Sequence, residues 1–334
     1  MSPRTIISEE ELVQQFLAPL AASAPGAFEL KDDCATITAP AGHDLVITTD
    51  ALTSGLHFFP DEKPETIGWR ALAINISDLA AKGATPLHYL LALALPEAPT
   101  ADWMIQFAGG LKDAQDHYGL TLIGGDTDRR PGVPLSVTIT AMGLVPSGRM
   151  VRRGTAKVGD RIFVSGTLGD AALGLALRRA PEAKRFPELD KDQRAFLVGR
   201  FLRPTPRIEL SGLLIDSASA AMDLSDGLAK DLGRMCKASG VGARVSLGKL
   251  PLSVAAAAVL AAHPELAEAP ANGGDDYEIL ATIAPANAAA FEEAALEQGV
   301  AVTDVGEIVK GAGVTLLDAA GKPAVLAKTG YEHF

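Results

Sequence analysis

Residues 45–50 read Leu-Val-Ile-Thr-Thr-Asp, an apolar and β-branched run that ends at a carboxylate. Such a run is typical of a strand, and Asp50 stands where that strand is expected to end. The pattern returns in residues 120–126 and again in residues 218–223, each time with an aspartate at the end. In α/β proteins the loops at strand ends usually bind the ligands. The three stretches therefore predict a mixed α/β fold with acidic strand ends.

Helical spacing surrounds these strands. Leu12, Phe16 and Leu20 share one helical face, and Ser8 before them is a suitable N-cap, which predicts a helix over residues 8–20. The other elements that the pattern predicts are helices at 64–82 and 101–118 and strands at 87–95, 135–145, 161–165 and 277–283.

A stretch rich in glycine and arginine, residues 147–159, interrupts this pattern. A chain of 334 residues is long enough for two domains. We expect the boundary there, with mixed α/β (α+β) domains at residues 1–146 and 147–334.

The composition excludes several classes of protein. A formal net charge of -11 argues against binding nucleic acid through a basic face. Cys34 and Cys236 form no CxxC pair, which fits a reducing cytoplasm better than a disulfide scaffold. The N-terminus lacks the apolar core of a signal peptide, and the alanine-rich run 254–262 is too short to span a membrane. We expect a cytoplasmic protein that binds neither nucleic acid nor membrane.

Asp50 and Asp126 adjoin a hydroxyl residue and a glycine, respectively, and Asp223 lies two residues before Ser225. Any one of these aspartates is explained by a turn, because aspartate bonds its own backbone there. The three together favour a ligand site. The hydroxyls of Thr48, Thr49 and Ser225 add the hard oxygen ligands that Mg²⁺ prefers.

Asp78 gives a second indication. It shares the stripe i, i+4, i+7, i+11 with Ile67, Ala71 and Ile74, which predicts that it faces the core. An inward carboxylate is costly unless it meets a metal, a base or hydrogen-bond donors. The alternative is a helix that is apolar all round, with Asp78 at its wet edge.

Several standard phosphate-binding motifs are absent from the sequence, among them the P-loop, the kinase catalytic loop and GxGxxG. Phosphate chemistry here would therefore depend on metals and backbone amides. Arg152 and Arg153 are the nearest candidate cations, or else an exposed linker pair. His57 is either a phosphate donor or an ordinary loop histidine. Tyr331 either stacks on a flat heterocycle or fills a gap in a core.

Short motifs also follow one another along nearly the whole chain. In order they are Asp32-Asp33, Thr48-Thr49-Asp50, Gly55-Leu56-His57-Phe58, Asn75-Ile76-Ser77-Asp78, Gly124-Gly125-Asp126-Thr127, Arg153, Ser165-Gly166-Thr167-Leu168-Gly169-Asp170, Asp223-Leu224-Ser225-Asp226-Gly227, Gly273-Gly274-Asp275-Asp276-Tyr277-Glu278 and Gly330-Tyr331-Glu332-His333-Phe334. This ordered set resembles the thiamine-monophosphate kinases, a family of the aminoimidazole-ribonucleotide-synthetase-like ATP-binding superfamily.

The resemblance implies a reaction and a set of site residues. The reaction is direct in-line transfer from ATP to thiamine phosphate, giving ADP and thiamine diphosphate without a protein nucleophile. Several Mg²⁺ ions would be held by Asp33, Thr48, Thr49, Asp50, Asp78, Asp126, Asp223 and Asp226. ATP would contact Tyr118, Gly125, Asp126, Arg153 and Ser225, and the substrate would contact His57, Asp275 and Tyr331. The resemblance also implies an N-terminal sheet that pairs across a homodimer, and a C-terminal α/β sandwich.

Three positions depart from the family's pattern. Lys31 stands where a glycine usually precedes the acidic pair, Asp275 where glutamate is common, and Tyr331 where tryptophan is common. The last two concern the geometry of substrate contacts rather than the metal site.

Alternatives remain within the superfamily and outside it. A selenophosphate synthetase-like enzyme would need a reactive cysteine in a glycine-rich loop, whereas Cys34 adjoins the acidic pair. A purine-synthesis-like enzyme would lack the Gly-Tyr-Glu-His-Phe ending. A nucleotide-binding sensor without catalytic activity would need fewer acidic positions.

Overall fold

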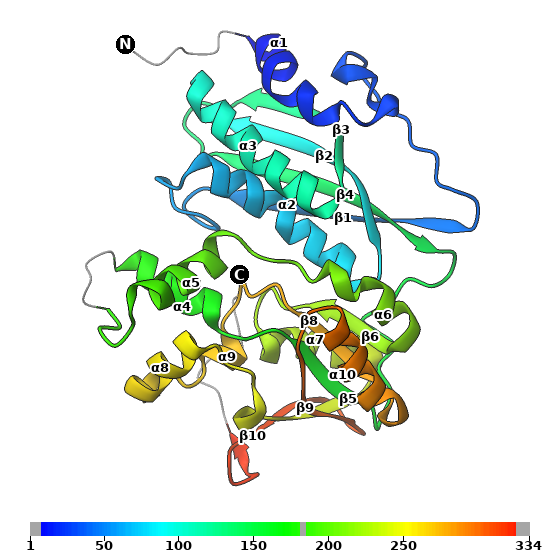
Figure 1. The fold of residues 1–334 in the computed structure, drawn as a ribbon, viewed down its shortest axis with the longest axis vertical. Helices are drawn as coiled ribbons and strands as arrows, with labels where there is room; N and C mark the ends of the chain where they lie inside the picture. The colour runs from blue at the N-terminus through cyan, green and yellow to red at the C-terminus, as the bar shows by residue number, and fades with distance from the viewer. Residues whose placement is uncertain (1–7, 181–184, 325–334) are drawn as a thin grey trace. The chain divides into compact units, whose positions relative to one another are not determined.

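The computed structural model describes residues 8–180 and 185–324. The chain divides into two compact units, one of Met1–Leu79 and Ala84–Gly148 and one of Ala80–Gly83 and Arg149–Phe334. Each unit has its own sheet with helices packed on it (Figure 1). The expectation of a mixed α/β fold is confirmed.

The sheet of the first unit has the strand order β1-β4-β2-β3. Its strands are β1 (His43–Thr53), β2 (Thr85–Leu95), β3 (Thr121–Arg129) and β4 (Ser136–Pro146). β4 pairs antiparallel with β1 and β2, and β2 pairs parallel with β3. Parallel neighbours need a crossover, which helix α3 (Ala101–Tyr118) supplies.

Helices α2 (Pro64–Ala81) and α3 cover one face of this sheet (Figure 1). Proline suits the first position of α2, because an N–H at that position would have no partner within the helix and its loss costs nothing. The two helices pack closely through glycines. A Cβ on Gly68 would lie 2.3 Å from the Phe107 carbonyl oxygen, and one on Gly110 would lie 2.0 Å from that of Glu65.

The N-terminal segment differs in part from the expected helix over 8–20. Helix α1 (Glu9–Leu12) begins as expected, since the Ser8 hydroxyl accepts a hydrogen bond from the Glu11 N–H at 3.0 Å. Leu12, Phe16 and Leu20 are buried as predicted. The α-helix nevertheless ends after one turn and continues as a π turn and a 3₁₀ turn. Pro19 explains this, because it has no N–H to donate and its ring would clash with the preceding turn.

The sheet of the second unit has the order β11-β10-β7-β9-β5-β8-β6 among the described residues. Its strands are β5 (Arg161–Ser165), β6 (Ala218–Asp223), β7 (Gly242–Ser246), β8 (Ile279–Ile283), β9 (Val302–Val309), β10 (Gly313–Leu317) and β11 (Pro323–Ala324). Only the β10–β7 pair among these is parallel.

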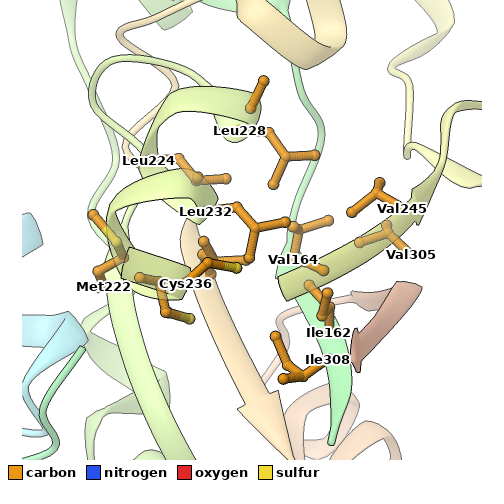
Figure 2. Close-up of a cluster of buried hydrophobic side chains, with 14 of the residues drawn as sticks. Ile162, Val164, Met222, Leu224, Leu228, Leu232, Cys236, Val245, Val305 and Ile308 are labelled. Carbon is orange, nitrogen blue, oxygen red and sulfur yellow. The ribbon is translucent and has the colours of Figure 1, made fainter. Parts of the chain in front are cut away.

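Helices pack on both faces of this second sheet. On one face, α7 (Leu228–Ser239) turns Leu232 and Cys236 toward Ile162 and Val164 of β5 (Figure 2). On the other face, the cluster includes residues of α6 (Ser211–Ser217) and α10 (Ala288–Glu297), where Phe291 meets Phe163 edge to face at 5.3 Å. The other α-helices of this unit are α4 (Asp170–Arg179), α5 (Lys191–Leu202), α8 (Val254–Ala262) and α9 (Ala269–Asn272). The helix–sheet–helix layering confirms the expected α/β sandwich.

Residues Ala80–Gly83 belong to the second unit although they lie within the first half of the sequence. The Lys82 ammonium donates to the Ala221 carbonyl at 2.8 Å, and the Ser211 hydroxyl donates to the Ala80 carbonyl at 3.4 Å. Ala80 and Ala81 are buried with Leu210 and Leu214. The core of the second unit therefore includes two residues from early in the chain, Ala80 and Ala81.

Candidate active site

The first group of predicted site residues lies where β1 meets α2. Thr48 and Asp50 alternate with Ile47 and Thr49 along β1 and so share a face of the strand. The Thr48 hydroxyl donates a hydrogen bond to Oδ2 of Asp78 at 2.5 Å. Asp78 has a donor there, but it is only half-buried whereas the other residues of 66–81 are buried, so it stands at the more exposed edge of α2. The rest of α2 near it is buried almost all round, as the alternative had it.

The surroundings of Asp50 disfavour its charged form. Asp50 is exposed, yet the protein atoms around its carboxylate remove part of its water. This desolvation and, second, the nearby charge of Asp78 raise the pKa of Asp50 to about 6. Two carboxylates that repel each other beside a hydroxyl are a donor set that a divalent cation would stabilise. The residues present therefore fit Mg²⁺.

The strands carrying two of the three aspartates run on further than the sequence pattern predicted. Asp50 is paired with Ile139 inside β1, and Asp126 is paired with Ala92 inside β3. The expectation that these strands end at their aspartates is wrong, because β4 and β2 continue alongside and supply backbone partners. Only Asp223 of the three ends its strand, β6.

Thr49 lies on the opposite face of β1 from Thr48 and Asp50. Its hydroxyl donates to the Ile139 carbonyl at 3.1 Å and accepts from the Thr140 hydroxyl at 3.0 Å. Strand alternation therefore separates the Thr49 hydroxyl from the pair Asp50 and Asp78, although the sequence predicted all three as ligands together.

Other predicted site residues line a cavity of about 910 Å³ in the first unit. Asp33, Gly125 and Asp126 line it, together with Asp32. The remainder of its wall is largely apolar and includes Ile47, Leu90, Ala92 and Met142. An apolar wall with acidic groups at its margin suits a ligand that has a flat body and an anionic part neutralised by cations.

Gly125 has a structural reason of its own. A Cβ there would lie 1.8 Å from the Leu91 carbonyl oxygen on the neighbouring strand. Only glycine allows β3 to approach β2 so closely at this point. The close approach alone accounts for the glycine, whether or not ATP contacts it.

The second group of predicted residues lies on the loop between β6 and α7. Asp223 is 7% exposed at the end of β6. The Asp231 carboxylate, fully buried in the first turn of α7, accepts hydrogen bonds from the N–H groups of Ser225 at 3.1 Å and Asp226 at 2.9 Å. Asp231 thereby fixes the loop that carries Ser225 and Asp226.

Charges around this loop are closely balanced. The Asp226 carboxylate forms ion pairs with Lys230 at 3.3 Å and Arg234 at 2.6 Å. Arg234 also donates to Asp231 at 2.8 Å. Burial, the largest cause, raises the pKa of Asp231 to about 6. A cation that bound Asp226 would therefore compete with Lys230 and Arg234.

The loop lies against the Gly273–Glu278 motif. Asp275 donates its backbone N–H to the Ser225 carbonyl at 2.8 Å, and Tyr277 donates to the Leu224 carbonyl at 2.9 Å. Leu224 in turn donates to the Glu278 carbonyl at 2.8 Å. The structure thus brings together a residue predicted to contact ATP, Ser225, and one predicted to contact the acceptor, Asp275.

The remaining predicted contacts are more scattered. In His57, half-buried, Nδ1 accepts the Thr53 N–H at 3.0 Å, which places the proton of the neutral ring on Nε2. Tyr118 is only 6% exposed and packs against Trp69 with ring centroids 5.8 Å apart, so little of its ring is left for a nucleotide. Arg153 is exposed. Tyr331 lies outside the described residues.

Neither unit by itself presents a complete metal site. Six predicted ligands, Asp33, Thr48, Thr49, Asp50, Asp78 and Asp126, belong to the first unit, and two, Asp223 and Asp226, belong to the second. Across residues 8–180 and 185–324, no three His, Cys, Asp or Glu side chains gather closely enough to hold a metal ion. The Mg²⁺ site stays a prediction.

Sequence reasoning missed the residues that hold these loops. Asp231 had a usable signal, because an acidic residue in the first turn of a helix after a polar loop often bonds that loop's N–H groups. Arg200 and Arg207, which pair with the buried Glu278, had none. They lie more than 70 residues away from Glu278 in the sequence, and periodicity carries no information over such a distance.

Known proteins share this architecture. The chain matches the family model of the AIR synthase related protein, N-terminal domain, over residues 31–145 and that of its C-terminal domain over residues 157–318. The fold and the two matches define the class, an AIR synthase related protein. No helix among the described residues is long and apolar enough to cross a membrane.

Relatives with assigned activities narrow the class. The chain is 42% identical to the thiamine-monophosphate kinase of Escherichia coli (strain K12), over 91% of this chain and 90% of that protein. Its structure is similar to that of the thiamine-monophosphate kinase from Stenotrophomonas maltophilia K279a, with 41% identity, a TM-score of 0.80 and coverage of 88% and 91%. It is also similar to AaThiL complexed with AMPPCP and TMP, with 29% identity, a TM-score of 0.76 and coverage of 98% and 99%. The chain belongs to the thiamine-monophosphate kinase family.

Proposed function

We propose that this protein transfers the γ-phosphoryl group of ATP to thiamine phosphate, giving thiamine diphosphate and ADP. Similarity to thiamine-monophosphate kinases over nine-tenths of the chain supports the substrates. The structural observation that carries the proposal is the hydrogen bond from the Asp275 N–H to the Ser225 carbonyl at 2.8 Å. It supports the proposal because transfer between two bound phosphates requires that an acceptor contact, here proposed for Asp275, lie beside a nucleotide contact, here proposed for Ser225.

The chemistry needs no nucleophile from the protein. A phosphate oxygen of thiamine phosphate attacks the γ-phosphorus, and the bond from that phosphorus to the bridging oxygen of ADP breaks. The contribution of the protein is to position the reactants and to balance their charge. In this scheme Ser225 and Arg153 orient ATP, while His57, Asp275 and Tyr331 orient the acceptor.

Mg²⁺ is the cofactor that the acidic residues fit best. Asp33, Asp50, Asp78, Asp126, Asp223 and Asp226 and the hydroxyl of Thr48 would hold several ions between them. When bound, Mg²⁺ neutralises the phosphate charge so that two anionic groups can approach each other. The raised pKa of Asp50 beside Asp78 supports this assignment, because those carboxylates need a positive partner.

A second copy of the chain would cover the exposed face of the first sheet. Helices α2 and α3 cover one face. On the other face Thr49 and Ala51 are exposed, as are Ile47 (59%) and Ala92, which also line the cavity described above. An apolar side chain so exposed on a sheet face favours an interface. We therefore propose a homodimer that pairs these faces. A cytoplasmic location agrees with two cysteines that remain free thiols.

One reaction tests the proposed function. The full chain is incubated with ATP, MgCl₂ and thiamine phosphate, and thiamine diphosphate is measured by chromatography. Parallel reactions replace thiamine phosphate with thiamine, add a chelator, or use the Asp223→Asn variant. We expect product only in the complete wild-type reaction. Faster phosphorylation of thiamine, or no thiamine diphosphate at all, would reject the assignment.

A further inference from the structure

Two residues of the Gly273–Glu278 motif have an unusual backbone. Asp275 has φ 70° and Tyr277 has φ 51°, both in the left-handed region that favours glycine. Such conformations persist in non-glycine residues only where the surroundings hold them firmly, and they often mark functional sites. The question is which groups hold this segment.

On one side, the segment is bound to the loop after β6. The N–H groups of Asp275 and Tyr277 donate to the carbonyls of Ser225 and Leu224. These bonds fix the two strained residues against the loop. They leave the Asp276 carbonyl, which shares a peptide group with the Tyr277 N–H, to be bound from elsewhere.

On the other side, Asp276 is anchored at the start of α4. Its carboxylate, 3% exposed, accepts hydrogen bonds from the N–H groups of Gly169 at 2.7 Å and Ala171 at 3.2 Å. Asp276 is thus fixed inward, while the neighbouring Asp275 remains half-buried and nearer to solvent.

Arg200 of helix α5 completes the arrangement. It is 9% exposed, and one guanidinium nitrogen donates both to the Asp276 carbonyl at 3.1 Å and to Oε1 of Glu278 at 2.7 Å. Glu278 has no exposed surface and also accepts from Arg207 at 2.7 Å and from the Ser165 hydroxyl at 2.6 Å. Arg200 therefore joins the buried, hydrogen-bonded Glu278 carboxyl group directly to the backbone of the strained segment.

We propose that Arg200 is a positioning residue that, through the Asp276 carbonyl and the Glu278 carboxylate, holds Asp275 in its left-handed conformation and thereby sets the affinity for the phosphorylated acceptor. This inference rests on the proposed function, because it takes Asp275 as an acceptor contact. Arg200 itself acts at one remove, through the backbone.

Ser165 offers a matched control. Its hydroxyl donates to Glu278 and accepts the Ile279 N–H at 2.8 Å, so Ser165→Ala weakens the same buried anchor. Both of these hydrogen bonds of the Ser165 hydroxyl are to Glu278 and Ile279, and neither is to Asp276. Weakening the bonds to Glu278 should therefore lower the stability of both variants. Loss of the hydrogen bond to the Asp276 carbonyl should raise the KM for thiamine phosphate only in Arg200→Gln.

The experiment measures steady-state kinetics of the full chain with ATP, Mg²⁺ and thiamine phosphate. Arg200→Gln should raise the KM for thiamine phosphate about tenfold, the effect of losing a charged hydrogen bond. The KM for ATP should change less than about twofold. Ser165→Ala should change neither KM by more than about twofold, although both variants unfold at lower urea. Arg200→Lys keeps the charge beside Glu278, so its KM for thiamine phosphate should lie between those of wild type and Arg200→Gln. It replaces Arg200→Gln in the test if that variant fails to fold.

Hydrogen exchange supplies a readout that does not depend on turnover. Amides in residues 273–278 should exchange about tenfold faster in Arg200→Gln than in wild type or Ser165→Ala. Equal KM values and equal exchange in wild type and Arg200→Gln, or equal losses in both variants, would overturn this inference alone. Absence of thiamine diphosphate from the wild-type reaction would instead overturn the proposed function.

Discussion

Replacing Asp231 with asparagine should remove much of the pH dependence of stability in the second unit. Asp231 is fully buried, and its pKa is raised from 3.8 to about 6, chiefly by that burial. The folded chain then holds the proton more tightly than the unfolded chain. The stabilisation by this group is therefore complete below about pH 3.8 and is lost as the pH rises through about 6.

The size of the effect follows from the shift. A difference of about two pH units in pKa corresponds to about 3 kcal/mol of unfolding free energy. About 2 kcal/mol of this falls between roughly pH 4.5 and pH 8, from the proton-binding curves of the two states. In Asp231→Asn the amide oxygen still accepts from the loop N–H groups of Ser225 and Asp226, so the fold survives while the titration disappears.

Urea titration at the two pH values, read out by hydrogen exchange of α7, gives the unfolding free energy of this unit. Tryptophan fluorescence is the internal reference, because Trp69 and Trp103 both belong to the first unit. Leu232→Ala, next to Asp231 and fully buried, is the control. It should destabilise by about 2–5 kcal/mol, equally at both pH values, since it does not titrate. Equal pH dependence in Asp231→Asn and wild type would refute the reasoning.

Four other changes test the remaining assignments. Asp78→Asn should lower turnover more than about a hundredfold with an unchanged circular dichroism spectrum, and near-normal turnover at saturating Mg²⁺ would exclude Asp78 as a metal ligand. Gly125→Ala should destabilise by about 2–3 kcal/mol in urea, because its methyl group overlaps the Leu91 carbonyl. Tyr331→Ala should raise the KM for thiamine phosphate about three- to tenfold before it affects ATP; an unchanged KM removes Tyr331 from the site. Ile47→Lys should give a monomer in analytical ultracentrifugation, and a persistent dimer would place the interface elsewhere.

Local sequence patterns predicted the elements well wherever one face of an element is buried. Ile67, Ala71 and Ile74 are buried as their shared stripe predicted, although the other sides of α2 are buried as well. The Ser8 cap was also correct. The ends of β1 and β3 were not predictable, because continuation past Asp50 and Asp126 depends on backbone partners in β4 and β2 that local composition does not reveal.

The candidate site was predictable as a set of residue types but not as an arrangement. The Thr48 hydroxyl meets Asp78 because β1 packs against α2, a contact between two elements that the sequence pattern did not reveal. Strand alternation turns the side chains of Thr49 and Asp50 to opposite faces, which could have been predicted from the sequence. The prediction failed because it treated neighbouring residues of one motif as ligands of one site. The hydrogen bond from Arg200 to the Asp276 carbonyl joins elements that are far apart in the chain, so only the folded structure reveals it.

The membership of Ala80–Gly83 in the second unit has a consequence for synthesis on the ribosome. Ala80 emerges 131 residues before Ser211, to whose hydroxyl it is bonded in the folded protein. At about 5–20 residues per second, this interval lasts roughly 7–26 s. Throughout it, the last turn of α2 has been made while Leu210 and Leu214, its neighbours in the core, have not. The second core therefore cannot close until more than half of the chain has been translated, and a nascent chain that stalls before residue 210 leaves Ala80 and Ala81 open to chaperones.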